Sequence, residues 1–173
     1  MTSNLFEINF DKNQSKTTND LGMREMQERV YEKRNSQYLL VKSPPASGKS
    51  RALMFVGLDK LHNQGIKKVI IAVPERSIGK SFKDTELSKF GFYWDWEVKP
   101  LNNLTIGGGE KSKVQHFVKF MNSTDPSDNI LIATHATLRF AFEELDDSLF
   151  DNTLLAIDEF HHVSRDDNSV LGN

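Results

Sequence analysis

The chain has 173 residues, enough for one domain with a hydrophobic core, and its 38% hydrophobic and 27% charged content is typical of globular proteins. The absence of cysteine excludes a disulfide scaffold, and no apolar run is long enough to span a membrane, so we expect a cytoplasmic protein. The net charge of −2 does not indicate a nucleic-acid-binding protein, although basic residues outnumber acidic ones over residues 1–100.

The N-terminal part of the chain predicts an arm, a helix, a strand and a second helix. Residues 1–20 are polar apart from one short apolar cluster, and we expect them to lie on the domain as an arm. Helical spacing of apolar residues predicts a helix from about residue 22 to 35. An apolar run predicts a buried strand over 37–42, and a largely apolar helix follows and ends near Gly65.

Alternating strands and helices are predicted along the rest of the chain. Further buried strands are expected over 67–73, 129–133 and 153–157. Helices are expected over 76–87, 111–121 and 136–145. The aromatic-rich segment 90–106 suggests one or two more strands, whose aromatic side chains either cover a hydrophobic face, the interpretation we favour, or stack on nucleic-acid bases. This order predicts an α/β fold with a mostly parallel sheet flanked by helices.

The segment between the strand at 37–42 and the next helix has the residues of a phosphate-binding loop. It ends in Gly-Lys-Ser, and backbone N–H groups at a helix N-terminus, a lysine and a serine hydroxyl can hold a triphosphate and its Mg²⁺. The strict pattern begins with glycine, whereas this loop begins with Ser43. The residues expected to bind the nucleotide are Pro45, Ala46, Ser47, Gly48, Lys49 and Ser50.

Two carboxylates, Asp158 and Glu159, follow the strand predicted over 153–157. A carboxylate at this position can anchor the metal ion with Ser50, and its neighbour can act as a base for water. Acidic residues are also common where loops begin, so the functional interpretation of this pair depends on the presence of the phosphate loop. The histidines lack the spacing of zinc ligands, and structural zinc is not expected.

These two stretches resemble motifs I and II of the DExH-type superfamily-two helicases and translocases, a group similar to DEAD/DEAH-box helicases and restriction-enzyme motor subunits. The first loop position in that superfamily is often alanine or serine, which agrees with Ser43. The sequence Asp158-Glu159-Phe160-His161 is similar to motif II. The resemblance implies a RecA-like P-loop NTPase domain over residues 21–173 that hydrolyses ATP with Mg²⁺.

Three further segments resemble superfamily motifs in the same order. Residues 24–27 are similar to an adenine-reading Arg-x-x-Gln, 73–79 to motif Ia, and 133–138 to a threonine-rich segment that grips the nucleic-acid backbone. The residues these matches imply are Arg24 and Gln27 for adenine and Pro74, Arg76, Thr134 and Thr137 for nucleic acid. Two structural alternatives stay open: Gln27 as a surface helix residue, and Arg76 in an internal salt bridge with the acidic pair.

The resemblance also implies roles and partners. Lys49 binds the phosphates, Asp158 holds Mg²⁺, Glu159 activates water, and His161 couples the nucleotide to the nucleic acid. The partners are DNA or RNA and a second RecA-like domain. Later motifs are not present, so we expect a domain that is incomplete at its C-terminus and nearly inactive alone. Alternatives are a non-catalytic nucleotide- or nucleic-acid-binding module and the motor subunit of a restriction system.

Overall fold

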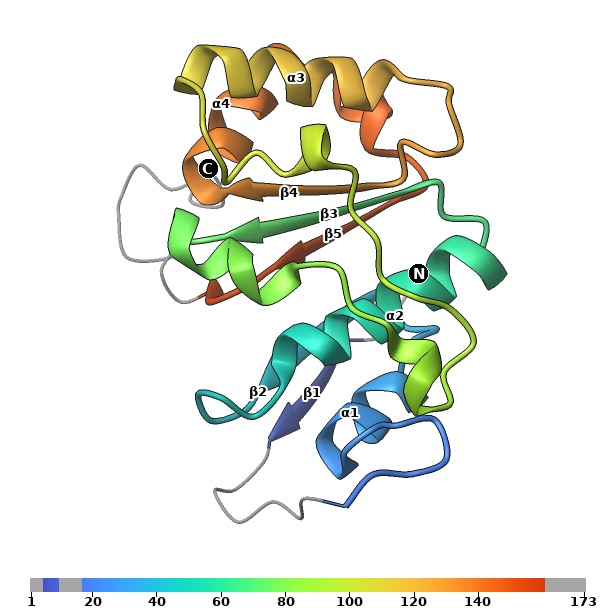
Figure 1. Cartoon of the computed structure of the whole chain (residues 1–173). Helices are drawn as coiled ribbons and strands as arrows, with labels where there is room; N and C mark the ends of the chain where they lie inside the picture. The colour runs from blue at the N-terminus through green and yellow to red at the C-terminus, as the bar shows by residue number, and fades with distance from the viewer. Residues whose placement is uncertain (1–4, 10–16, 161–173) are drawn as a thin grey trace. The chain divides into compact units, whose positions relative to one another are not determined.

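The computed structural model describes residues 5–9 and 17–160, and their strand ladders are all parallel (Figure 1). The chain divides into two compact units, residues 1–65 with 84–96, and residues 66–83 with 97–173. Helices accompany the strands in both units, so the predicted α/β fold with parallel strands flanked by helices is confirmed.

The first unit is built on a two-stranded parallel sheet. Strand β1 (Leu5–Asn9) pairs with β2 (Tyr38–Lys42), and the unit contains the helices α1 (Glu25–Glu32) and α2 (Lys49–Asn63). One face of the sheet packs on the two helices through Ile8, Leu39, Val41, Met26, Val30, Ala52 and Val56. The strand β1 lies in the segment that the sequence predicted as an arm, and it was not predicted as a strand.

A buried carboxylate joins the ends of α1 and α2. Asp59 accepts hydrogen bonds from the Tyr31 hydroxyl at 3.1 Å, from Asn63 Nδ2 at 2.8 Å and from Gln64 Nε2 at 2.7 Å. Burial opposes ionisation of Asp59, but these hydrogen bonds and the charge of Arg34 leave its pKa lowered. Burial, together with the charge of Asp59, raises the pKa of Tyr31 to about 12.

The second unit is a three-stranded parallel sheet with β3 (Lys68–Val73) between β4 (Ile130–Thr134) and β5 (Thr153–Ile157). All of β3 is buried, as expected for a parallel strand covered on both faces. The helices α3 (Glu110–Asn122) and α4 (His135–Glu144) lie on one side of this sheet (Figure 1). Their core contacts come from β3 and β4 residues such as Ile70, Ala72, Leu131 and Ala133.

The segment predicted as aromatic strands, 90–106, contains the 3₁₀ helix η3 (Pro100–Asn102) and the end of η2 (Leu87–Phe90) rather than strands. Two more 3₁₀ helices lie elsewhere: η1 (Arg76–Phe82), where the sequence predicted a helix over 76–87, and η4 (Asp147–Phe150) before β5. The strand prediction over 90–106 is wrong, because the segment makes only isolated bridges, at Trp96 and Asn103. Its aromatic side chains pack against other rings: Phe92 contacts Tyr31 and Phe55 as well as Tyr93 and Trp94. Trp96 and Phe92 are buried, whereas Tyr93 is 64% exposed.

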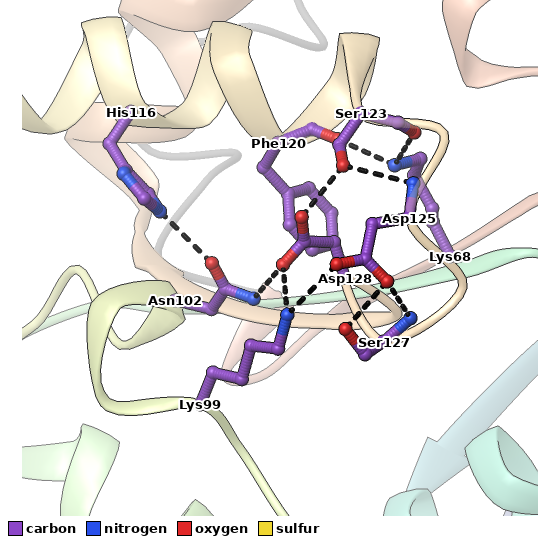
Figure 2. A network of polar contacts seen from close by, with 9 residues as sticks. All are labelled: Lys68, Lys99, Asn102, His116, Phe120, Ser123, Asp125, Ser127 and Asp128. Carbon is purple, nitrogen blue, oxygen red and sulfur yellow. Dashed lines mark hydrogen bonds and ion pairs between the residues drawn. The ribbon is translucent and has the colours of Figure 1, made fainter.

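A polar network closes the end of the second unit where β3 and β4 begin (Figure 2). Asp128 accepts from Ser123 Oγ at 2.7 Å, from Lys99 Nζ at 2.9 Å and from Asn102 Nδ2 at 3.3 Å. The bond from Ser123, followed by that from Lys99, holds the pKa of Asp128 far below its usual range. These contacts join the loops at the amino ends of the strands. The predicted site residues of this unit lie at the opposite edge, where the strands end.

Beside this network, the buried amine of Lys68 ties the first residue of β3 to the C-terminal end of α3. Its Nζ donates to the carbonyl oxygens of Phe120 at 2.5 Å and Ser123 at 3.0 Å (Figure 2). Burial lowers the pKa of Lys68, and the charge of Asp128 opposes that shift.

Candidate functional site

The predicted phosphate loop connects β2 to α2 in the first unit. Gly48 is the residue before α2 and has a φ of 92°, which L side chains rarely adopt. A Cβ at Gly48 would lie 2.6 Å from Gln27 Nε2, so this position has neither the backbone conformation nor the space for a larger residue. The glycine of Gly-Lys-Ser is therefore required by the local structure.

The loop is closed on itself by its serines. The hydroxyls of Ser43 and Ser47 are 2.7 Å apart, and the Ser47 N–H donates to the Pro44 carbonyl oxygen at 3.3 Å. Ser43, which stands where the strict pattern has glycine, thus uses its side chain to join the two ends of the loop. Between them Pro45 and Ala46 are exposed, and Ala46 has a φ of 59°.

Lys49 and Ser50 are the first two residues of α2, and both are partly buried. The first N–H groups of a helix have no partner within the helix and carry a partial positive charge. Because α2 begins directly at the loop, these N–H groups lie beside the lysine and the hydroxyl. The arrangement is one that can bind an anion such as a phosphate.

The predicted adenine-reading residues reach this loop. Gln27 is only 2% exposed, so the alternative of a surface helix glutamine is wrong. Its Oε1 accepts from the Arg24 backbone N–H at 2.9 Å, and its Nε2 donates to the Gly48 carbonyl oxygen at 3.1 Å. The start of α1 is thereby bonded to the residue that precedes Lys49, a contact that the sequence did not predict.

The acidic pair lies at the carboxyl end of β5 in the second unit. Asp158 is 9% exposed; its N–H donates to the Ala72 carbonyl oxygen of β3 at 2.8 Å. The Asp158 Oδ1 accepts from the Glu159 N–H at 3.1 Å. Glu159 has a φ of 53°, a left-handed conformation that is uncommon outside glycine and is concentrated at functional sites.

The N-terminus of α4 lies at the same edge of this sheet. Thr134 caps the helix by accepting the Thr137 N–H at 3.2 Å, and the Thr137 hydroxyl donates to Glu110 Oε1 at 2.5 Å. Thr137 is fully buried and Thr134 is 8% exposed. A nucleic-acid contact through the Thr137 hydroxyl would require its bond to Glu110 to open.

Sequence reasoning missed His135, the first residue of α4. Its Nε2 lies 3.0 Å from the Asp158 carbonyl oxygen, so α4 contacts the backbone of the acidic pair directly. The only signal in the sequence is the position of His135 inside the threonine-rich segment.

Three further predicted site residues lie after β3 or after the acidic pair. Pro74 follows β3 and is partly buried, and Arg76 is the first residue of η1. His161 lies outside the described residues. The phosphate loop and the acidic pair belong to different units, and their convergence on one magnesium ion stays a prediction.

A parallel α/β fold with a Gly-Lys-Ser loop between a strand and a helix, and with an acidic pair ending another strand, has the features of P-loop nucleotide-binding proteins. The family model named DEAD/DEAH box helicase matches residues 24–170. The chain belongs to this family, so the predicted resemblance to DEAD/DEAH-box helicases is confirmed. DEAD/DEAH box helicase domains use ATP.

A relative extends this finding. The chain is 67% identical over 170 residues to a protein of Bacillus subtilis (strain 168) named "Putative ATP-dependent helicase YeeB". The match covers 98% of this chain and 28% of that relative, so the chain spans little more than a quarter of the relative's length. No solved structure matches the chain. Within the described part of the chain, no helix is long and apolar enough to cross a membrane.

Proposed function

We propose that this domain, over residues 21–173, binds ATP with Mg²⁺ and hydrolyses it as part of a helicase or translocase acting on DNA or RNA. A second RecA-like domain, in the same polypeptide or another subunit, completes the active site. The observation that carries the proposal is the phosphate loop, whose Gly48 is bonded to Gln27 and leads directly into α2. Membership of the DEAD/DEAH box helicase family supports it.

In the proposed mechanism the backbone of the loop and the Lys49 amine bind the β- and γ-phosphates. Glu159 orients a water molecule and takes its proton as the water oxygen attacks the γ-phosphorus. The bond from phosphorus to the β–γ bridging oxygen breaks, and the electron pair leaves with ADP. The left-handed backbone of Glu159 supports this role, because strained conformations are retained where they place a functional group.

The proposed magnesium site uses few protein ligands. In the described ranges, 5–9 and 17–160, no group of three or more His, Asp or Glu side chains could hold a metal ion. Mg²⁺ is commonly bound by one or two protein oxygens together with substrate phosphates and water, which fits a set of Ser50 and Asp158. When bound, the ion neutralises charge that develops on the phosphate oxygens.

Adenine recognition is assigned to Gln27 and Arg24. The Gln27 amide uses one N–H on Gly48 and one acceptor position on Arg24, which leaves a second N–H and a second lone pair for the adenine edge. This assignment would connect recognition of the base with the shape of the phosphate loop, because one amide contacts both.

The nucleic-acid face is assigned to the carboxyl ends of β3 and β4. Pro74 and Arg76 would contact the backbone after β3, and the first turn of α4 after Thr134 would present its N–H groups to phosphate. We propose that the capping bonds of Thr134 and Thr137 orient this turn. The coupling role of His161 belongs to the same proposal.

Two variants of the intact natural protein test the proposal. Glu159→Gln should retain binding of Mg·ATP and lose turnover by about a hundredfold or more, because the base is removed while the loop is untouched. Lys49→Ala should lose ATP affinity. Binding is measured by titration with a fluorescent ATP analogue, and turnover by phosphate release with single-stranded DNA or RNA.

The results separate the candidate functions. Normal hydrolysis by Glu159→Gln would refute the role of Glu159. Binding of ATP and nucleic acid without turnover by the unsubstituted protein would support a non-catalytic module instead. A matched control is Glu143→Gln, an exposed residue near the C-terminal end of α4, which should leave both measurements unchanged.

A further inference from the structure

The peptide group that joins Asp158 to Glu159 is held by its neighbours in the second unit. The preceding peptide group is bonded to β3, since the Asp158 N–H donates to the Ala72 carbonyl oxygen at 2.8 Å. The Asp158 carbonyl oxygen lies 3.0 Å from His135 Nε2 at the start of α4. A carbonyl oxygen only accepts hydrogen bonds, so the imidazole donates through Nε2 in this contact.

The orientation of this peptide group decides where the Glu159 carboxylate points. The carbonyl of Asp158 and the N–H of Glu159 belong to one planar unit, so fixing the carbonyl also fixes the N–H. That N–H donates to Asp158 Oδ1, and Glu159 continues with a φ of 53°. A left-handed conformation of this kind persists when surrounding contacts enforce it, and the bond from His135 is such a contact.

The imidazole is fixed in turn by the cap of α4. Thr134 accepts the Thr137 N–H, and the Thr137 hydroxyl donates to Glu110 at the start of α3. His135 lies between these two threonines in the first turn of the helix. A displacement of this turn would therefore carry the imidazole with it and rotate the peptide group before Glu159.

We propose that His135 is a positioning residue that transmits nucleic-acid binding at the first turn of α4 to the orientation of Glu159. The inference rests on the proposed function, which places the nucleic acid at this turn and the attacking water at Glu159. His135 makes a direct hydrogen bond to the backbone of the acidic pair, and this bond connects the proposed nucleic-acid site with the proposed catalytic site.

The test compares His135→Leu with His135→Gln in the intact natural protein. Leucine removes the donor, whereas the glutamine amide retains an N–H at similar reach. His135→Leu should lower the nucleic-acid-stimulated kcat about tenfold to a hundredfold, because small misplacements of a catalytic group have effects of that size. The Kd for Mg·ATP should stay within about twofold, and His135→Gln should recover most of the kcat.

A matched control is His116→Leu. His116 also makes a side-chain hydrogen bond in the second unit, to Asn102 Oδ1 at 2.9 Å, but at the end of the sheet where the strands begin (Figure 2). Its loss should not change kcat beyond its effect on stability. An unchanged kcat in His135→Leu, or an equal loss in His135→Gln with the same melting temperature, would overturn the proposal.

Hydrogen exchange tests the contact between His135 and the acidic pair without a measurement of catalysis. Without nucleotide, the amides of residues 157–160 should exchange faster in His135→Leu than in the unsubstituted protein, His135→Gln and His116→Leu. Unchanged exchange would overturn the proposal even if kcat falls. If exchange responds as expected but the unsubstituted protein shows no nucleic-acid-stimulated hydrolysis, the positioning contact stands and the proposed function fails.

Discussion

Replacing Gln27 by alanine removes the hydrogen bond that joins α1 to the phosphate loop and the hydrogen bond that caps the start of α1. The residue is 2% exposed, and its amide joins the Arg24 N–H to the Gly48 carbonyl oxygen. Each such bond contributes about 0.5–1.5 kcal/mol net, and the Gly48 carbonyl oxygen keeps its bond from the Ala52 N–H at 3.1 Å. The binding-competent form of the loop should therefore lose about 1–3 kcal/mol relative to other forms.

That loss should weaken nucleotide binding about fivefold to a hundredfold, since every 1.4 kcal/mol changes an equilibrium constant about tenfold. The assay is calorimetric titration with two ligands, Mg·ATP and inorganic tripolyphosphate with Mg²⁺. Tripolyphosphate has no base, so weaker binding of both ligands would reflect the loop. Weaker binding of ATP alone would indicate that Gln27 acts only on adenine.

The control is Gln115→Ala, which removes an exposed glutamine of α3 and should change neither affinity. Wild-type affinity of Gln27→Ala for both ligands would refute the reasoning, because the amide would then stabilise neither the loop nor the bound base.

Three further predictions follow from polar contacts of the two units. Asp128→Asn should lower the free energy of local opening of β4, measured by hydrogen exchange at neutral pH, by about 1–2 kcal/mol. The pKa of Asp128 is lowered in the folded state. The difference between the two proteins should therefore be fully present above the ordinary aspartate pKa, near 4, and should be lost as the pH falls from that value toward the lowered pKa. Tyr31→Phe should cost about 1–2 kcal/mol in urea unfolding, since it removes a donor to buried Asp59. With the Tyr31 pKa raised to about 12, its own contribution should be lost as the pH rises from about 10, and Tyr31→Phe should lack that loss. Ser43→Gly, which restores the strict loop pattern, should weaken Mg·ATP binding in the same titration, because it removes the hydroxyl contact across the loop; equal or tighter binding would contradict this.

The regular elements of the second unit were predictable because their physical causes are local. The run at 153–157 is continuous and apolar, and it forms β5 with those bounds. The β-branched run ending at Val73 forms the fully buried β3, within one residue of the predicted range. Composition was misleading over 90–106, where aromatic residues favour strands but Gly91 and Pro100 turn the chain. The rings of Phe92, Tyr93 and Trp94 pack against one another instead of lining a strand.

The site was predictable as a set of motifs but not as a set of contacts. The pattern located Gly48 and Lys49 between a strand and a helix, and Asp158 after another strand. The bonds from Gln27 to Gly48 and from His135 to Asp158 depend on how segments 21 and 23 residues apart approach each other. Such approaches are set by packing of α1 and α4 on their sheets, which spacing along the chain does not encode.

The strand β1 connects residues 5–9 to the strand that leads into the predicted phosphate loop. Its ladder runs along all of β2, from Leu5 beside Tyr38 to Asn9 beside Lys42, and Ile8 packs into the core that α1 and α2 share. A recombinant version trimmed to the start of the family match at residue 24 would leave that ladder open and the core uncovered. Whether a shortened protein retains residues 5–9 should therefore affect the stability of β2 and of the loop that follows it.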